Sequence, residues 1–194
     1  MPRNRRQTPR DHRVNEVIVA ARELFLSQGF NKTPMSQIAE SLGVANAAVY
    51  WYFKTKDELL AEVWSRTLDD EIERLQNGPE DPFERLIQGL IHLRPYRQLH
   101  MTIHERMSIS EPVAEVHERL VDWIRGLVLE GMDYHNWDRS QEQDLVELVV
   151  VIFEGTNVPG IRTRTATDLI TSVLSRISPA LELNTSGQPP ALSS

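Results

Sequence analysis

Imidazole and phenol side chains recur at every fourth position in one stretch of the chain, namely at His92, Tyr96, His100 and His104. Pro95 interrupts the helical pattern, so the register is fixed only from Tyr96 onward. His100 and His104 have the spacing with which two histidines on one helix face can bind a metal ion. Other side chains could approach this pair in the folded chain: Glu105, Glu111 and His117.

Three interpretations of these histidines stay open: a metal pair, the polar lining of a ligand pocket, or ordinary surface and core histidines. No acidic residue has a matching position on the same helix, so no metal ligand and no cofactor is assigned from the sequence alone. Methionine and aromatic side chains adapt well to varied apolar ligands, although they fill ordinary cores equally well. If there is a pocket, we expect it to be lined by Tyr96, His100, Met101, His104, Met107, Trp123, Leu127 and Phe153.

A second set of residues, from Ala45 to Lys56, has the chemistry of a DNA contact. Asn46 can bond adenine in a bidentate way, and the methyl group of Ala47 can touch a thymine methyl. Tyrosine hydroxyls and lysine ammonium groups suit phosphates. We expect Asn46, Ala47 and Tyr50 to approach base edges. We expect phosphate contacts from Thr33, Trp51, Tyr52, Lys54 and Lys56. Burial in the core is the alternative for Phe53 and for part of Trp51.

Two short helices on either side of a tight turn would position this second set. The first helix begins after Thr33, a plausible N-cap, with Pro34 at its first position. The second runs from about Asn46 to Phe53. Three residues fix the arrangement: a small residue lets the helices approach, a glycine turns the chain, and an apolar residue fastens the second helix onto the first. These are Ala39, Gly43 and Val49.

Flanking helices are expected on both sides of this pair. Apolar residues at helical spacing predict a supporting helix from about Arg13 to Gln28, closed by Gly29. Thr55 and Glu58 form the pattern of a capping box that opens a further helix, which extends to about Gln76.

These residues resemble the TetR family of bacterial transcriptional regulators over roughly the first third of the chain. The shared positions include Gly29-Phe30, Ile38-Ala39, Gly43-Val44, Val49-Tyr50 and Tyr52-Phe53. The resemblance implies a helix-turn-helix head, a helical body that holds a small-molecule inducer, and a dimer. Departures from the family pattern concern single DNA contacts: Pro34 replaces a frequent Thr or Ser, Ala45 replaces a common capping residue, and Ala47 replaces a frequent glycine.

Charge is distributed unevenly along the 194 residues, whose formal net charge is −7. Residues 1–60 carry nine Lys or Arg and six Asp or Glu, giving +3, whereas residues 61–194 carry twelve and twenty-two, giving −10. Such asymmetry favours a nucleic-acid-binding head on an acidic body. The absence of cysteine excludes disulfides and thiolate metal sites, and it fits a reducing cytoplasm. The basic start is not followed by an apolar signal region, and no membrane association is expected.

The rest of the chain is predicted to be all helix. The run from Leu145 to Phe153 is almost continuously apolar, so its helix should be buried on all sides. The resemblance implies that the last two helices pair with their copies across a two-fold axis; a core within one chain is the alternative. The expected dimer interface comprises Val146, Val149, Val150, Phe153, Leu169, Val173, Leu174 and Ile177.

We therefore predict an all-α protein of about nine helices with four parts. These are a flexible basic arm (1–12), a helix-turn-helix domain (13–58), a ligand-binding and dimerisation domain (59–180) and a disordered tail (181–194). The resemblance implies a cytoplasmic, ligand-responsive regulator, commonly a repressor, that binds a palindromic DNA operator as a homodimer and is released by an apolar or amphipathic small molecule. Two alternatives are a DNA-bound interaction protein without an effector, and a metal-handling or enzymatic body with a vestigial head. No catalytic motif is present, so no enzyme activity is predicted.

Overall fold

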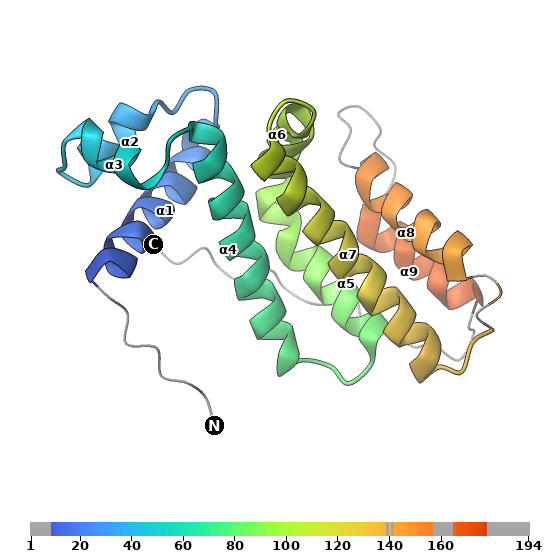
Figure 1. The fold of residues 1–194 in the computed structure, drawn as a ribbon. Coiled ribbons are helices and arrows are strands. Elements are labelled where there is room, and N and C mark those ends of the chain that lie inside the picture. Colours follow the sequence, from blue (N-terminus) through green and yellow to red (C-terminus); the bar gives the residue numbers. More distant parts are fainter. Residues whose placement is uncertain (1–8, 139, 141, 157–164, 178–194) are drawn as a thin grey trace.

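The described part of the computed structural model comprises residues 9–138, 140, 142–156 and 165–177. Within these residues the chain is all-α, as predicted, with nine α-helices and one 3-10 turn. The elements are α1 (Pro9–Gln28), α2 (Met35–Ser41), α3 (Asn46–Tyr52), α4 (Lys56–Gln76), α5 (Pro82–Leu93), the 3-10 turn η1 (Arg94–Tyr96), α6 (Arg97–Met107), α7 (Glu111–Tyr134), α8 (Glu142–Thr156) and α9 (Ala166–Ile177). Figure 1 shows α1 to α3 gathered at one end of α4, and α5 to α9 on its other side.

The head formed by α1 to α3 follows the predicted order, with corrections at two helix starts. Helix α1 begins at Pro9, four residues before the expected start, so residues 9–12 of the predicted flexible arm are helical. It ends at Gln28, and the next residue, Gly29, has a φ of +87° that suits a residue without a Cβ. The Phe30 ring then turns back to lie edge-on to Phe25 at 5.2 Å between centroids. Thr33 does not cap α2; the N-cap position is occupied by Pro34 without a side-chain bond.

Helix α4 connects the head to the body. Its predicted capping box is present at the N-terminus, where the Thr55 hydroxyl accepts a hydrogen bond from the backbone N–H of Glu58 at 3.1 Å. The Glu58 carboxylate in turn accepts from the backbone N–H of Lys54 at 2.7 Å. From this anchored start α4 packs against α1 on one side and against α5, α6 and α7 on the other.

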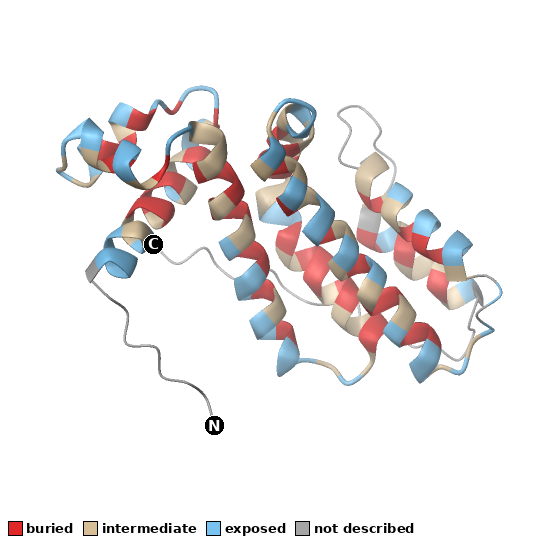
Figure 2. Cartoon of the chain, viewed as in Figure 1, coloured by how far each residue is buried: buried red, intermediate tan, exposed pale blue. Residues whose placement is uncertain are grey.

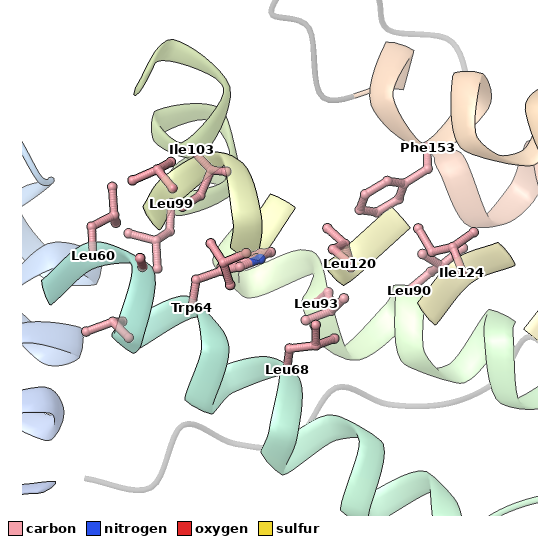
Figure 3. Packing of buried hydrophobic residues seen from close by; sticks show 14 of the residues in the cluster. Leu60, Trp64, Leu68, Leu90, Leu93, Leu99, Ile103, Leu120, Ile124 and Phe153 are labelled. Carbon is pink, nitrogen blue, oxygen red and sulfur yellow. The ribbon is translucent and has the colours of Figure 1, made fainter. Parts of the chain in front are cut away.

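The long helix α7 is the centre of the body, since it packs against α4, α5, α6 and α8. Its buried residues recur at helical spacing, as in Val113, Val116, Leu120 and Ile124. Figure 3 shows Trp64 of α4 among leucines and isoleucines from several helices of this core. No helix in the described ranges is long and apolar enough to span a membrane.

Two glycines allow the body helices to approach very closely. An added Cβ at Gly131 of α7 would lie 2.5–2.7 Å from three ring atoms of Phe83, a fully buried residue of α5. At Gly89 of α5 an added Cβ would lie 2.3 Å from the Trp123 ring of α7. By contrast, an added Cβ at Gly126, also in α7, would meet nothing within 4 Å.

Helix α8 is less completely buried than its apolar sequence predicts. Leu148 is 43% exposed and Val151 is 66% exposed, so one side of α8 carries apolar side chains into solvent (Figure 2). The prediction of burial on all sides is therefore wrong for a single chain.

Four of the eight residues expected at a dimer interface lie inside the chain itself. Val146, Val149, Phe153 and Leu174 are all at most 7% exposed, because α8 packs on α7 and α9. They are core residues, which corrects their assignment to an intermolecular surface. Three others are half-buried, namely Val150, Leu169 and Val173. The side chain of Ile177 lies outside the described part of the chain.

Candidate nucleic-acid interface and histidine cluster

The turn between α2 and α3 has the geometry expected of a helix-turn-helix. Gly43 has a φ of +64°, a left-handed conformation that favours glycine. The backbone N–H of Val44 then donates to Ala39 at 3.0 Å and closes the turn. Ala39 and Val49 are 2% and 0% exposed, so the small residue and the valine lie between the two helices, as predicted.

One face of α3 is exposed to solvent. Tyr50 is 43% exposed and Trp51 is 58% exposed, and Lys54 lies in the open just beyond the helix. The small residues at the N-terminal end of the same helix are also exposed: Ala45, Asn46 and Ala47. Figure 2 shows this exposed side on the outer surface of the head. Six of the nine residues proposed for DNA contact therefore form one accessible surface, which we call the α3 face.

An arginine that sequence reasoning left in the flexible arm extends the α3 face. The guanidinium of Arg10 lies 4.9 Å from the centroid of the Trp51 ring, and Trp51 lies edge-on to Tyr52 at 4.8 Å. Tyr52 is half-buried against the core. Arg10 adds a positive charge beside the exposed aromatics, and the helical start of α1 at Pro9 is what holds it there.

Thr33 is placed where it cannot contact DNA. The residue is 0% exposed, and its hydroxyl donates to the carbonyl oxygen of Gly29 at 2.9 Å. Its role is to fasten the loop after α1, which corrects the predicted phosphate contact.

Lys56 is likewise committed to internal contacts. Its ammonium donates to the carbonyl oxygens of Phe30 at 2.9 Å and Thr33 at 3.3 Å, and it lies 4.1 Å from the centroid of the Phe30 ring. Burial lowers the pKa of Lys56, and the nearby positive charge of Arg106 lowers it further. The predicted phosphate contact of Lys56 is therefore replaced by a structural one.

A paired arginine joins the start of α4 to the end of α6. Two nitrogens of the Arg106 guanidinium donate to Asp57, Nε to Oδ1 at 2.5 Å and Nη2 to Oδ2 at 2.8 Å. This hydrogen-bonded contact with Asp57 raises the pKa of Arg106. Together with Lys56 and Phe30, these two residues form what we call the head–body junction.

In the body, the structure brings His100 and His104 together with His117 and Glu154. One donor atom from each lies within 4.8 Å of those of the other three. The residues come from α6, α7 and α8, whereas Glu105 and Glu111 are exposed and belong to no such group. We call these four residues the histidine cluster.

Sequence reasoning considered His117 as a neighbour but missed Glu154. Glu154 directly follows the apolar run of α8, and a single acidic residue at the end of an otherwise buried helix was the available signal. Its Oε1 lies 3.3 Å from Nε2 of His117 and 3.8 Å from Nε2 of His100, and its other oxygen contacts His104.

Burial and charge affect the pKa values of His100 and Glu154 in different ways. His100 is 2% exposed, and burial lowers its pKa to about 4, against the attraction of Glu154. Burial on its own would raise the pKa of Glu154, but hydrogen bonding by His104 and His117 outweighs it and lowers the pKa to about 2. The metal-free cluster therefore combines a neutral buried imidazole with an ionised carboxylate.

The eight residues expected to line a ligand pocket lie in separate places. His100, His104 and Phe153 lie together, with 5.1 Å between the ring centroids of His100 and Phe153. Trp123 and Leu127 line a groove of about 220 Å³ beside α4 and α5, and Met101 lines another of about 260 Å³ near Gly29. Tyr96 packs on the core and Met107 is exposed. None of the grooves described for these residues is lined by all eight, so a single pocket formed by them stays a prediction.

Comparisons with known proteins give the same assignment as the turn geometry. The family described as "Bacterial regulatory proteins, tetR family" matches residues 17–63. The HTH-type transcriptional regulator AcrR of Shigella flexneri is 35% identical over 97 residues, which are 48% of this chain and 45% of that protein. Curated relatives at 35% identity or more match this chain over less than half of their own length.

Solved structures extend the likeness in fold to the body. A TetR transcription regulator from Haloarcula marismortui aligns with a TM-score of 0.67 at 16% identity, covering 88% of this chain and 98% of that one. The Thermus thermophilus FadR, a TetR-family repressor in complex with lauroyl-CoA, aligns at 0.61 and 16% identity, covering 92% of this chain and all of that one. Residues 17–63 therefore match the TetR family in sequence, and the described helices have the fold of solved TetR-family structures.

Proposed function

We propose that the protein is a transcriptional regulator that binds a palindromic DNA operator as a homodimer and responds to a ligand in its body. The observation that carries this proposal is the α3 face, which is exposed, aromatic and flanked by cations on a correctly formed helix-turn-helix. In a helix-turn-helix, the second helix enters the major groove and places its N-terminal residues at the base edges. Relatives that match the head are named as transcriptional regulators or repressors, which supports the same function.

Each residue of the α3 face has a defined part in this proposal. Asn46 lies in the first turn of α3, where its amide can bond adenine, and Ala47 offers a methyl group beside it. Tyr50 is one turn further along the same side, within reach of bases or sugar. Lys54 and Arg10 supply the positive charge for phosphates.

The dimer is proposed to form through the outward side of α8 and α9. Its support is the exposed apolar pair Leu148 and Val151, which a second copy would cover, rather than the buried residues expected from the sequence. A two-fold dimer places two α3 helices so that each meets one half of a palindrome. Repression is the function named for some relatives. It follows if the bound dimer occupies a promoter.

A ligand would act by changing the separation of the two heads. At the head–body junction, the Arg106–Asp57 pair connects α6 directly to the start of α4. A molecule that binds one arrangement of the body better than the other biases the equilibrium by its difference in affinity, typically 1–3 kcal/mol. The lauroyl-CoA complex of the T. thermophilus repressor supports an apolar or amphipathic effector in this fold.

The proposal is tested by measuring binding to the DNA upstream of the protein's own gene over a series of salt concentrations. We expect a sequence-selective complex whose affinity falls steeply with salt. Tyr50→Ala should weaken the complex. Tyr134→Ala is the matched control, because Tyr134 is 54% exposed but lies at the end of α7, away from the head. Equal loss in both variants, or binding without sequence preference, would contradict the proposal.

A further inference from the structure

The histidine cluster has three features that the proposed DNA contact and dimer do not use. Its members come from three consecutive helices, and one ligand atom from each member lies within 4.8 Å of those of the others. The ring centroids of His104 lie 4.6 Å from His100 and 4.8 Å from His117. Three imidazoles at such distances are not held together by apolar packing alone, since each carries two polar nitrogens.

Hydrogen bonding within the protein leaves part of this cluster unsatisfied. Glu154 contacts Nε2 of His104 and of His117, but among the described residues neither ring nitrogen of the buried His100 has a hydrogen-bond partner. His100 is 98% buried, so water cannot easily take the place of a partner. A buried polar group without a partner costs about 1–3 kcal/mol, so the imidazole of His100 favours a further species that completes the site.

We infer that His100, His104, His117 and Glu154 form a binding site for one divalent transition-metal ion of the Zn²⁺ class. Three neutral imidazoles and one carboxylate give the four nitrogen and oxygen ligands that Zn²⁺ takes in tetrahedral sites. Hard ions such as Mg²⁺ and Ca²⁺ prefer oxygen ligands throughout, so this donor set disfavours them.

The geometry requires only a small contraction to bind such an ion. Ligand atoms about 2.0–2.1 Å from a tetrahedral Zn²⁺ lie roughly 3.3 Å from one another. The donor atoms here lie within 4.8 Å, and two of the Glu154 distances are already 3.3 and 3.8 Å. Side-chain rotations that move the ligand atoms by about 1 Å would therefore bring them to metal-binding distance, while the helices that carry them stay in place.

The surroundings of the site restrict its ligands and also leave a route by which a metal ion can enter. The His100 ring is stacked on the buried Trp64 ring at 5.5 Å, and Phe153 lies on another side, so His100 has little freedom to move away. The side chains of His104 and Glu154 are 34% and 22% exposed, so an ion can reach the cluster from their side. Binding would connect α6, α7 and α8 through one centre.

Zinc binding by the full-length, untagged protein tests this inference. After treatment with a chelator and its removal, the protein is dialysed against Zn²⁺ and the bound metal is measured. We expect one ion per chain and a higher melting temperature with Zn²⁺ than without it. Replacement of zinc by Co²⁺ should give the visible absorption bands of a tetrahedral site. These readouts need no DNA, so they can fail or succeed independently of the proposed function.

Variants with matched burial separate a metal ligand from a merely structural histidine. The side chains of His117 and His92 are both 14% exposed, and each is within ion-pair distance of one glutamate, but only His117 belongs to the cluster. His117→Gln should weaken Zn²⁺ binding by more than about 100-fold, since loss of a supporting partner already costs about 10- to 100-fold. His92→Gln should leave the affinity unchanged.

His104→Gln gives a second test at a more exposed ligand, in case His117→Gln does not fold. It should also lose the ion while keeping the helical content of the parent. The inference is overturned if the parent binds less than one Zn²⁺ per chain at saturating metal. It is equally overturned if His92→Gln weakens binding as much as the cluster variants do.

Discussion

Lys54 and Lys56 are separated by one residue, but substitution by methionine should lower stability at Lys56 and change DNA binding at Lys54. Lys56 makes two hydrogen bonds to backbone carbonyls and lies over the Phe30 ring, whereas Lys54 is exposed on the α3 face. Changing Lys56 to methionine keeps most of the apolar stem but removes the ammonium. The carbonyl oxygens of Phe30 and Thr33 then lose their partner.

The expected cost follows from these contacts. Hydrogen bonds to charged groups contribute about 1.5–3 kcal/mol each when buried, and an exposed cation over an aromatic ring adds about 0.5–1 kcal/mol. Because Lys56 is only half-buried, water replaces part of what is lost, and we expect Lys56→Met to lower the free energy of unfolding by about 1–3 kcal/mol. For a chain of this size each kcal/mol lowers the melting temperature by roughly 2–4 °C.

Lys54→Met should instead leave stability within about 0.5 kcal/mol and change DNA binding. Each lost phosphate contact reduces the slope of log affinity against log salt by about 0.9, or about 1.8 for the two copies in a dimer. Thermal unfolding and a salt series, performed on both variants at the same protein concentration and well below the melting temperature, measure the two effects. A stable Lys56→Met protein with a reduced salt slope would refute the assignment of Lys56 to internal contacts.

Two further predictions concern packing and assembly. Gly131→Ala should be about 1–3 kcal/mol less stable than Gly126→Ala by chemical denaturation, because both gain the same helix propensity but only the first places a methyl group against the enclosed Phe83 ring; equal stabilities would show that the ring can move aside. Val151→Glu should shift the protein from dimer to monomer in light scattering after size-exclusion chromatography, while Ile109→Glu, at a residue 71% exposed outside α8, should leave the dimer intact. A Val151→Glu protein that stays dimeric would place the interface elsewhere.

Local sequence rules predicted the head well because its determinants are close in sequence. Gly29, Gly43 and the capping pair Thr55 and Glu58 each act through backbone bonds within a few residues, and the structure has all of them. Thr33 shows where such reasoning stops. A threonine before a helix is a good cap in isolation, but here α2 begins at Met35, so Pro34 occupies the N-cap position and the Thr33 hydroxyl donates to the carbonyl oxygen of Gly29.

The body sites depend on contacts that no local pattern contains. Glu154 follows His100 by more than fifty residues, and only the packing of α8 on α7 brings it to the imidazoles. The same packing covers Val149 and turns Val151 outward, a choice that an almost uniformly apolar run does not specify. Composition could indicate a core helix there, but it could not say which of its sides meets which neighbour.

The head–body junction also determines where this protein could be cut and recombined. A chimera that joins this head to the body of another family member at residue 58 would keep Asp57 but lose Arg106, because the two partners lie 49 residues apart. The chimera would leave the Asp57 carboxylate in the first turn of α4 without its arginine, and it would change the packing beside Phe30. If α6 is transferred together with the head, or if an arginine is placed at the matching position of the new body, the contact between α6 and the start of α4 is kept.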